Sequence, residues 1–351
     1  MLNQQNVKNI YISIKTVLTI TKNSSIMLAV TVNNFYFSIM GKEIHMVQIR
    51  NLKKSYKSFK VIDGLDMTIN KGDVYGFLGK NGCGKSTTMN IICNIIPKDE
   101  GEIILGENGE KIKIGYLPET PALFGYMNGY EYLEYIAACA GYKGDTKARI
   151  AEVLDITGMT EGGKRRIKGY SRGMNQRMGI AATIFNNPDL IILDEPTSAL
   201  DPEGRAEVMS IINNLTQTGA TILLCTHILS DVERVANRIG IMKNGRLAIE
   251  DTIPNVKSRF VHDSIEISFN EISEEKLNII RNADFAKNVQ FFSSSCLAVI
   301  DVDNSTEGMI KTMKLLSDNG ISASKIQTTS PTLEQIYIQT VSDGAAERGN
   351  F

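Results

Sequence analysis

Short apolar runs alternate with segments of helical periodicity across residues 46–251. Three of these runs, at residues 74–78, 191–193 and 221–225, show no regular alternation of apolar and polar side chains. Such runs are typical of strands that are buried on both faces of a sheet. The pattern therefore predicts an α/β domain in which helices cover a mainly parallel sheet.

The pattern changes after Pro254, where alternating and helical segments are mixed. The predicted elements are a strand at 264–269, a helix at 274–281, two strands within 289–300 around a turn at 293–295, a helix at 306–316, a strand near 321–326 and a helix opened by Pro331. Residues 255–351 are therefore expected to form a small α+β accessory domain.

Residues 1–45 show no sustained helical or strand period and are expected to be a poorly ordered leader. The first strand pattern, at residues 47–52, begins directly after Met46. The leader is dominated by amino acids with A- and T-rich codons, and Lys42-Glu43 can be encoded as a ribosome-binding sequence. We therefore expect the functional chain to begin at Met46. The intact mass of the protein from its native host tests this expectation.

Two other interpretations of the leader remain open, namely a disordered segment and an interfacial anchor built on residues 26–40. A membrane-spanning helix at residues 25–40 is disfavoured, because Asn33 and Asn34 would place polar amides at its centre.

Composition indicates a globular protein that is soluble by default, with 42% hydrophobic and 22% charged residues. The 38 basic and 39 acidic residues give a net charge of -1, so no nucleic-acid partner is expected. The five cysteines include no C-x-x-C pair. A zinc or redox site of that type is therefore excluded, and a reducing compartment fits best.

The clearest chemical signal is a phosphate-binding pattern, G-x-x-x-x-G-K-S, between an apolar run and a helical segment at residues 87–95. Glycines allow successive N–H groups to face phosphate oxygens, and the helix adds its positive N-terminus. Lys85 would bridge the β- and γ-phosphates of a nucleotide, and Ser86 would bind Mg²⁺. The predicted nucleotide-binding residues are Gly79, Lys80, Asn81, Gly82, Cys83, Gly84, Lys85, Ser86 and Thr87.

Two carboxylates follow the apolar run at residues 190–193, and they supply the second half of this predicted site. Side chains alternate in direction along a strand, so Asp194 and Glu195 would point in different directions. One of the two acids would hold Mg²⁺, and the other would face water. The N-K-x-D pattern occurs at residues 70–73, before the phosphate loop, and no guanine-reading N-K-x-D segment follows that loop, which disfavours a GTP switch protein.

Residues 46–251 resemble the nucleotide-binding subunit of ATP-binding cassette (ABC) transporters, because further motifs of that family follow the phosphate loop in the expected order. Residues 170–174, Tyr-Ser-Arg-Gly-Met, are similar to the family's signature sequence, and residues 198–201 are similar to its D-loop. His227 stands where the family has its switch histidine. Tyr56 stands where an aromatic residue stacks on adenine.

The resemblance implies a P-loop NTPase fold with a helical subdomain at about residues 120–168. It also implies a homodimer, in which Ser171 and Gly173 contact the γ-phosphate bound by the opposite subunit from a helix beginning at residue 174. A helix N-terminus suits such an anion, although Ser171 could instead be a simple N-cap. Glu195 would be the general base, and His227 would contact the γ-phosphate or orient the attacking water.

Glu119 departs from the resemblance, because the family usually has glutamine at this position. A third carboxylate beside Asp194 and Glu195 would bind the metal more strongly, raise the pKa of a neighbour or point elsewhere. We count Glu119 among the expected Mg²⁺ ligands, with Ser86 and Asp194.

The tail contains Pro331-Thr332-Leu333-Glu334 and resembles that of bacterial antibiotic-resistance and multidrug exporters. The expected function is therefore ATP hydrolysis that powers export through a separate permease, at the inner face of the cell membrane. An ABC ATPase with a regulatory or assembly role and no solute is the alternative. ABC ATPases of translation usually carry two cassettes, whereas this chain has one phosphate loop. Chromosome and repair ATPases need a long coiled coil, and residues 87–193 lack sustained heptads.

Overall fold

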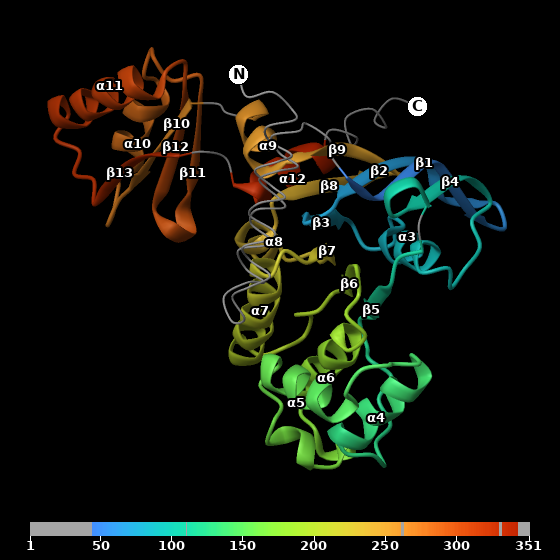
Figure 1. Cartoon of the computed structure of the whole chain (residues 1–351). Coiled ribbons are helices and arrows are strands. Elements are labelled where there is room, and N and C mark those ends of the chain that lie inside the picture. The colour runs from blue at the N-terminus through green and yellow to red at the C-terminus, as the bar shows by residue number, and fades with distance from the viewer. Residues whose placement is uncertain (1–43, 110, 261–262, 330–331, 343–351) are drawn as a thin grey trace, which may run out of the picture. The chain divides into compact units, whose positions relative to one another are not determined.

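The computed structural model describes residues 44–109, 111–260, 263–329 and 332–342. The chain divides between Thr252 and Ile253 into two compact units, which Figure 1 draws with their elements labelled. Nearly all of the predicted leader lies outside the described residues, and the first described strand begins at His45. Among the described residues, no helix has the length and apolar character needed to cross a membrane.

A six-stranded sheet forms the centre of the first unit, and all its strands are parallel except the last. Its strands, in spatial order, are β5 (Ile114–Leu117), β6 (Leu190–Asp194), β7 (Thr221–Cys225), β3 (Val74–Gly79), β8 (Arg238–Lys243) and β9 (Arg246–Thr252). Every residue of β3, β6 and β7 is buried. The predicted α/β fold is confirmed.

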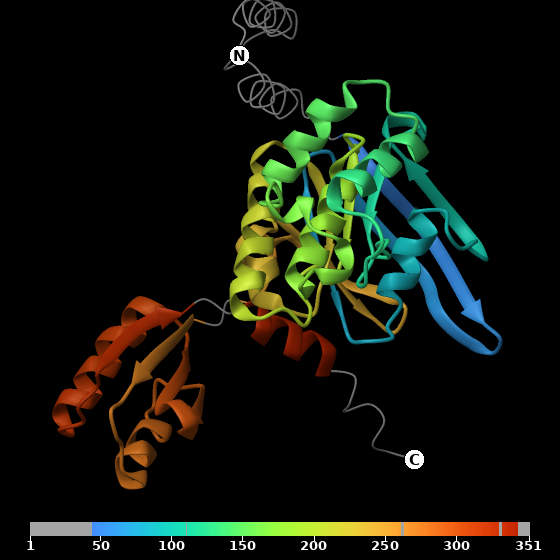
Figure 2. The same cartoon turned by 90° about the horizontal axis from the view of Figure 1, so that it is seen from below.

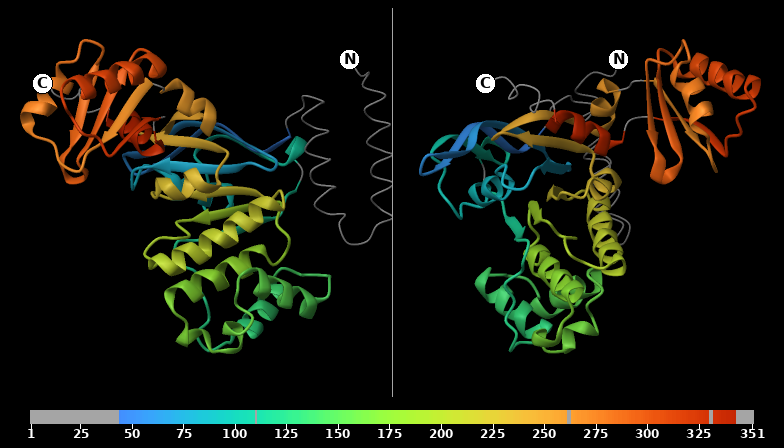
Figure 3. Two further views of the ribbon diagram at one scale, coloured as in Figure 1. Left: turned by 90° about the vertical axis from the view of Figure 1, so that its left-hand side faces the viewer. Right: turned by 180° about the vertical axis from the view of Figure 1, so that it is seen from behind.

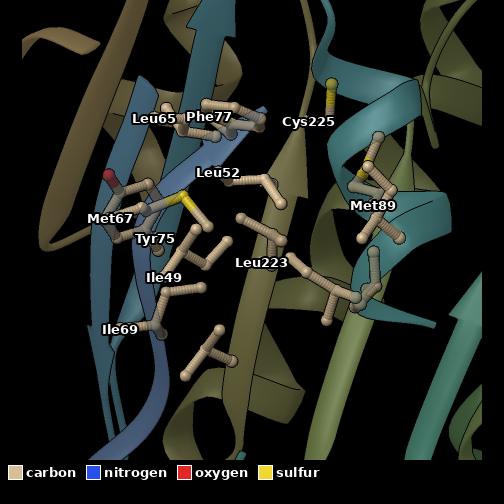
Figure 4. Close-up of a cluster of buried hydrophobic side chains, with 14 of the residues drawn as sticks. Ile49, Leu52, Leu65, Met67, Ile69, Tyr75, Phe77, Met89, Leu223 and Cys225 are labelled. Carbon is tan, nitrogen blue, oxygen red and sulfur yellow. The ribbon is translucent and has the colours of Figure 1, made fainter. Parts of the chain in front are cut away.

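A second, antiparallel sheet in this unit was not predicted. Its order is β2 (Phe59–Asn70), β1 (His45–Tyr56) and β4 (Glu100–Leu105). Figure 4 shows its apolar side chains, among them Ile49 and Leu65, gathered with Phe77, Leu223 and Met89 in one buried cluster. The antiparallel sheet therefore packs on the helix that follows the phosphate loop, and the phosphate loop is fixed between two sheets.

That helix, α3 (Lys85–Ile92), begins two residues before the predicted helix at 87–95 and ends three residues before its predicted end. Asn94 adopts a left-handed backbone conformation with φ +55°, which asparagine tolerates better than most residues do. The N–H groups of Asn94 and Ile95 donate to the carbonyls of Ile91 and Asn90. These two bonds form a Schellman motif, which ends the helix although the apolar spacing continues.

Three helices between β5 and β6 form a group at one end of the first unit (Figures 1 and 3). They are α4 (Gly129–Cys139), α5 (Thr146–Ile156) and α6 (Arg172–Ile184), with the short helices η2 (Gly162–Lys164) and η3 (Ile167–Gly169) between the last two. The side chains of Asn128, Asp145 and Ser171 cap their N-termini. The first unit also contains η1 (Glu107–Gly109), α7 (Pro202–Gln217) and α8 (Leu229–Val235).

The second unit contains an antiparallel sheet in the order β11 (Asn288–Phe292), β12 (Leu297–Val302), β10 (Asp263–Ser268) and β13 (Lys325–Thr329). Ile280 of α10 (Glu274–Arg281) and Leu316 of α11 (Ser305–Asp318) share a buried cluster with Ile265 and Ile300 of the sheet. The two helices therefore cover one face of this sheet, and Figure 2 gives a second view of the unit. The remaining elements are α9 (Ile253–Arg259), η4 (Ser293–Ser295) and α12 (Leu333–Ser342).

Two details of the second unit differ from the predictions. Ile321 does not begin a strand, because its N–H donates to Leu316 O in the turn that ends α11, and β13 starts four residues later. The N-terminal cap of α12 is formed by Thr332 and Gln335, since the side chain of each accepts from the backbone N–H of the other. Pro331, which was expected to open this helix, lies outside the described residues.

Candidate active site

The phosphate loop connects β3 to α3, and glycine is needed at two of its positions. Gly82 and Gly84 have φ values of +78° and +111°, a region that side chains rarely allow. A Cβ atom on Gly84 would also come within 2.9 Å of Val61 O in β2. The loop is therefore pressed against the antiparallel sheet and leads into the positive end of α3.

Lys85 is the first residue of α3 and is only 7% exposed. Its Nζ atom donates hydrogen bonds to Gly79 O at 2.7 Å and to Lys80 O at 3.2 Å. The ammonium group is therefore held inside the curve of the loop. In this position it can meet a phosphate without a large movement of its side chain.

The two carboxylates stand at the carboxyl end of β6. Asp194 is 5% exposed, and it accepts hydrogen bonds from the side chains of Ser86 and Cys225. Burial raises the pKa of Asp194, and the charges of Glu195 and Glu119 act in the same direction, whereas the two hydrogen bonds oppose them. Asp194 and Ser86 together offer two oxygen ligands directly beside the phosphate loop.

Glu195 has a left-handed backbone conformation with φ +49°, and its N–H donates to Cys225 O at 2.8 Å. Non-glycine residues in this region carry backbone strain, which is often found at functional sites. The Oε2 atom of Glu195 lies 2.9 Å from Nδ1 of His227, which follows β7. The strained turn thus directs the Glu195 carboxylate toward the histidine, whereas the Asp194 carboxylate bonds to Ser86 and Cys225.

These residues meet in one pocket of about 480 Å³. The pocket is lined by Val61, Asn81, Gly82, Gly84, Lys85, Ser86, Thr87, Glu119, Asp194, Glu195, Ser198 and His227. Three loops that are far apart in the sequence therefore contribute to a single polar cavity at the ends of β3, β6 and β7. Val61 was not predicted, and no motif identifies it, because it reaches the pocket through its contact with the phosphate loop.

Six of the predicted site residues do not line this pocket: Tyr56, Gly79, Lys80, Cys83, Ser171 and Gly173. Gly79 is needed for close packing, because a Cβ atom there would lie 2.6 Å from Cys83 Sγ. Ser171 is the N-cap of α6, where its side chain accepts from Met174 N at 3.2 Å, so the helix begins at Arg172, two residues before its predicted start.

A buried ionic cluster beside the pocket was not predicted. Asp231 of α8 is 5% exposed, and its carboxylate accepts from Thr197 Oγ1 at 2.8 Å and from the Arg205 guanidinium at 2.7 Å. Thr197 lies between Glu195 and Ser198, while Asp231 follows His227 by four residues. The loops that carry the glutamate and the histidine are therefore joined through one carboxylate.

The oxygen donors beside the phosphate loop suit Mg²⁺ bound together with a nucleotide. Within the described part of the chain, no group of three or more His, Cys, Asp or Glu side chains is placed to hold a metal. Mg²⁺ in nucleotide sites is usually bound by one or two protein oxygens, with phosphates and water completing the shell. The Asp194 carboxylate and the Ser86 hydroxyl fit that requirement.

A phosphate loop at a helix N-terminus, facing a buried aspartate and a glutamate–histidine pair, defines a nucleotide hydrolase of the P-loop class. A family model described as "ABC transporter" matches residues 62–198. The chain is 31% identical to the linearmycin resistance ATP-binding protein LnrL of Bacillus subtilis, over 84% of this chain and 97% of that protein. It is 32% identical to the bacitracin transport ATP-binding protein BcrA of Bacillus licheniformis, over 85% and 98%.

The solved structures that resemble this chain include a dimeric ATP-binding cassette in a post-hydrolysis state, bound to ADP and Pi. It is 26% identical, covers 59% of this chain and 99% of its own, and has a TM-score of 0.53. The chain belongs to the ABC transporter family. It is an ATP-binding subunit of such a transporter and an ATPase.

Proposed function

We propose that the chain hydrolyses ATP with Glu195 as general base and exports a solute through a separate membrane permease. The observation that carries this proposal is the single pocket that holds Lys85, Asp194, Glu195 and His227 together. Lys85 compensates the charge of the β- and γ-phosphates. Asp194 and Ser86 would hold Mg²⁺, which supplies further charge compensation when bound.

The Glu195–His227 contact supports a division of roles between these two residues. Glu195 is the more buried partner, because its side chain is 12% exposed against 55% for His227. The carboxylate accepts the proton of the attacking water, and the imidazole, held by Glu195 at Nδ1, can donate from its other nitrogen to the γ-phosphate. The strained Glu195 backbone fixes the direction of the base before ATP binds.

A head-to-tail homodimer accounts for the signature residues that lie outside the pocket. Ser171 and Gly173 stand at the N-terminus of α6, a position that favours an anion. A Cβ atom on Gly173 would make only ordinary contacts, with Gly204 Cα at 3.8 Å and Ser171 Oγ at 4.0 Å. In the proposed dimer, this helix N-terminus closes over the phosphates bound by the other subunit.

A groove beside the catalytic pocket supports a permease contact on residues 120–168. Glu119 lines both the pocket and the groove, whose walls include Pro121, Leu123 and Lys168. Tyr126, which is 69% exposed, stacks on Phe124 at a centroid distance of 5.7 Å. Exposed aromatic side chains are favoured at protein interfaces. Docking of a permease here would act directly on the chain segment that carries Glu119.

The relatives named for linearmycin resistance and bacitracin transport support an exported antibiotic as the solute. We expect a host that lacks the chain to become more sensitive to such compounds, and a plasmid copy of the wild type to restore resistance. A copy with Glu195→Gln should fail to do so. Unchanged sensitivity to linearmycin and bacitracin, with an active ATPase, would favour the regulatory alternative.

The partner is identified in the same host by affinity purification of the chain from detergent-solubilised membranes. We expect a polypeptide with about six apolar spans to be retained. Its retention would also place the chain at the inner face of the membrane.

Glu119→Gln should raise the Mg²⁺ concentration needed for half-maximal ATPase activity, because a neutral amide attracts the metal less than a carboxylate does. The measurement is a Mg²⁺ titration of ATPase activity at saturating ATP. Glu107→Gln, on the short helix η1 and outside the pocket lining, is a control for general loss of charge. An unchanged titration would remove Glu119 from the set of metal ligands.

A further inference from the structure

The hairpin of β1 and β2 carries Tyr56 beside the wall of the catalytic pocket. Tyr56 is the last residue of β1, it pairs with Phe59 of β2, and it is 49% exposed. Val61, two residues after Phe59, lines the pocket and contacts the phosphate loop at Gly84. The position of the Tyr56 ring relative to a bound nucleotide therefore depends on how rigidly this end of the hairpin is held.

Asp99 holds the hairpin at the residues that precede Tyr56. Its carboxylate accepts from Lys54 Nζ at 2.7 Å and from Ser55 N at 2.7 Å. Its own backbone N–H donates to Lys53 O at 3.0 Å. Three consecutive residues of β1 are thus bonded to a single residue, which belongs to the segment joining α3 to β4.

Lys54 connects this carboxylate with the tyrosine ring. The residue is only 8% exposed, and its Nζ atom lies over the ring of Tyr56, 5.5 Å from the centroid. A cation over an aromatic face is attracted to it. The hydrogen bond from Lys54 and then that from Ser55 N hold the pKa of Asp99 below its usual range, so this carboxylate stays charged at neutral pH.

We propose that Lys54 and Asp99 are positioning residues for nucleotide binding, which hold Tyr56 so that one ring face is covered by the ammonium group and the other receives the adenine base. This inference rests on the proposed role of Tyr56 as the adenine-stacking residue. Because Asp99 follows α3 in the chain, one segment fixes both ends of the nucleotide: the phosphate end through α3 and the base end through Asp99. A ring that is already held in place loses less conformational freedom when the base binds.

The test compares ligands with and without a base. Asp99→Asn keeps the shape of the side chain and removes its charge. We expect it to raise the Kd of ATP and of ADP about three- to tenfold, as for the loss of a partly exposed cation–π geometry. The Kd of inorganic tripolyphosphate, which has no base, should not change. Calorimetric titration of the full chain in the presence of Mg²⁺ measures all three constants.

The chain offers a matched control in the neighbouring ion pair. Lys53 and Glu100 join β1 to β4 at 2.7 Å, and this pair is more exposed than the pair of Lys54 and Asp99. The ammonium group over the Tyr56 ring belongs to Lys54. Glu100→Gln should therefore leave every Kd unchanged. Equal weakening of ATP and tripolyphosphate binding by Asp99→Asn would reveal general damage and overturn the proposal, and so would unchanged ATP binding.

Further variants separate this inference from the proposed function. If Asp99→Asn does not fold, Lys54→Met keeps the buried stem of the side chain and removes the cation, so the same selective loss of ATP and ADP binding is expected. Lys54→Arg, which keeps a cation at this position, should bind ATP and ADP as the wild type does. Tyr56→Ala should weaken the binding of ATP but not the binding of tripolyphosphate. If Tyr56→Ala weakens ATP binding while Asp99→Asn and Lys54→Met bind ATP as the wild type does, only the positioning role of Lys54 and Asp99 is wrong. If Tyr56→Ala binds ATP normally, adenine stacking itself is wrong, and the inference falls with it.

Discussion

Glu195→Gln should retain ATP and lower its hydrolysis rate by about 10²- to 10⁴-fold, the usual contribution of a positioned general base. Glutamine has nearly the same shape as glutamate, and its amide can still bond to Nδ1 of His227, 2.9 Å from the wild-type carboxylate. It cannot accept the proton of the attacking water at neutral pH. The loss should therefore appear in kcat, with the Kd of ATP close to that of the wild type.

Phosphate release measures the rate, and light scattering with ATP present measures the mass of the complex. If hydrolysis opens the proposed dimer, this variant should accumulate as an ATP-bound dimer that separates when ADP replaces ATP. Glu203→Gln, in the first turn of α7 and outside the pocket lining, is the matched control and should hydrolyse ATP normally. A turnover for Glu195→Gln that matches this control would mean that another group is the base.

Lys85→Ala is expected to act on binding rather than on the chemical step. A hydrogen bond to a charged group contributes about 1.5–3 kcal/mol, so the loss of the ammonium group should raise the Kd of ATP about 10- to 150-fold. The substitution also leaves Gly79 O and Lys80 O without the donor that they have in the wild type. The expected melting temperature without nucleotide is therefore somewhat lower as well.

Calorimetric titration at a temperature well below the melting midpoint separates these two effects. Lys98→Ala removes a lysine that also donates to a backbone carbonyl, Gly101 O at 2.7 Å, but does so outside the pocket lining. This control should bind ATP as the wild type does. Tight ATP binding by Lys85→Ala would contradict the assignment of Lys85 to the phosphates.

The sequence predicted those features of the fold that are carried by contiguous residues. The buried strands β3, β6 and β7 lack alternation, and the phosphate loop has fixed spacing before a helix, so both could be recognised locally. The end of α3 could not, because apolar spacing continues past it. There, Asn94 adopts a left-handed conformation that closes the last turn, and such a conformation interrupts a helix without interrupting its pattern.

In the candidate site, too, the residues identified by local motifs were predicted, and those placed by long-range contacts were not. Asp194 and Ser86 could be paired in advance, because a strand end and a phosphate loop have known positions in a parallel sheet. Val61 and Asp231 could not, since each reaches the site through a contact with residues distant in the chain. The side-chain directions of Asp194 and Glu195 were expected from strand alternation. The left-handed backbone at Glu195, just past β6, was not foreseen.

The carboxylate shared by Thr197 and Arg205 has a mechanical consequence. Asp231 is buried and is bonded to Thr197 and Arg205 at once, so moving it away from either partner would leave a buried carboxylate without one of its donors. We therefore expect a displacement of His227, four residues before Asp231, to be transmitted to Thr197 and to the adjoining residues 198–201. If the proposed roles of these residues are correct, the loop after Glu195 and the loop that carries His227 should respond together when a phosphate leaves the pocket.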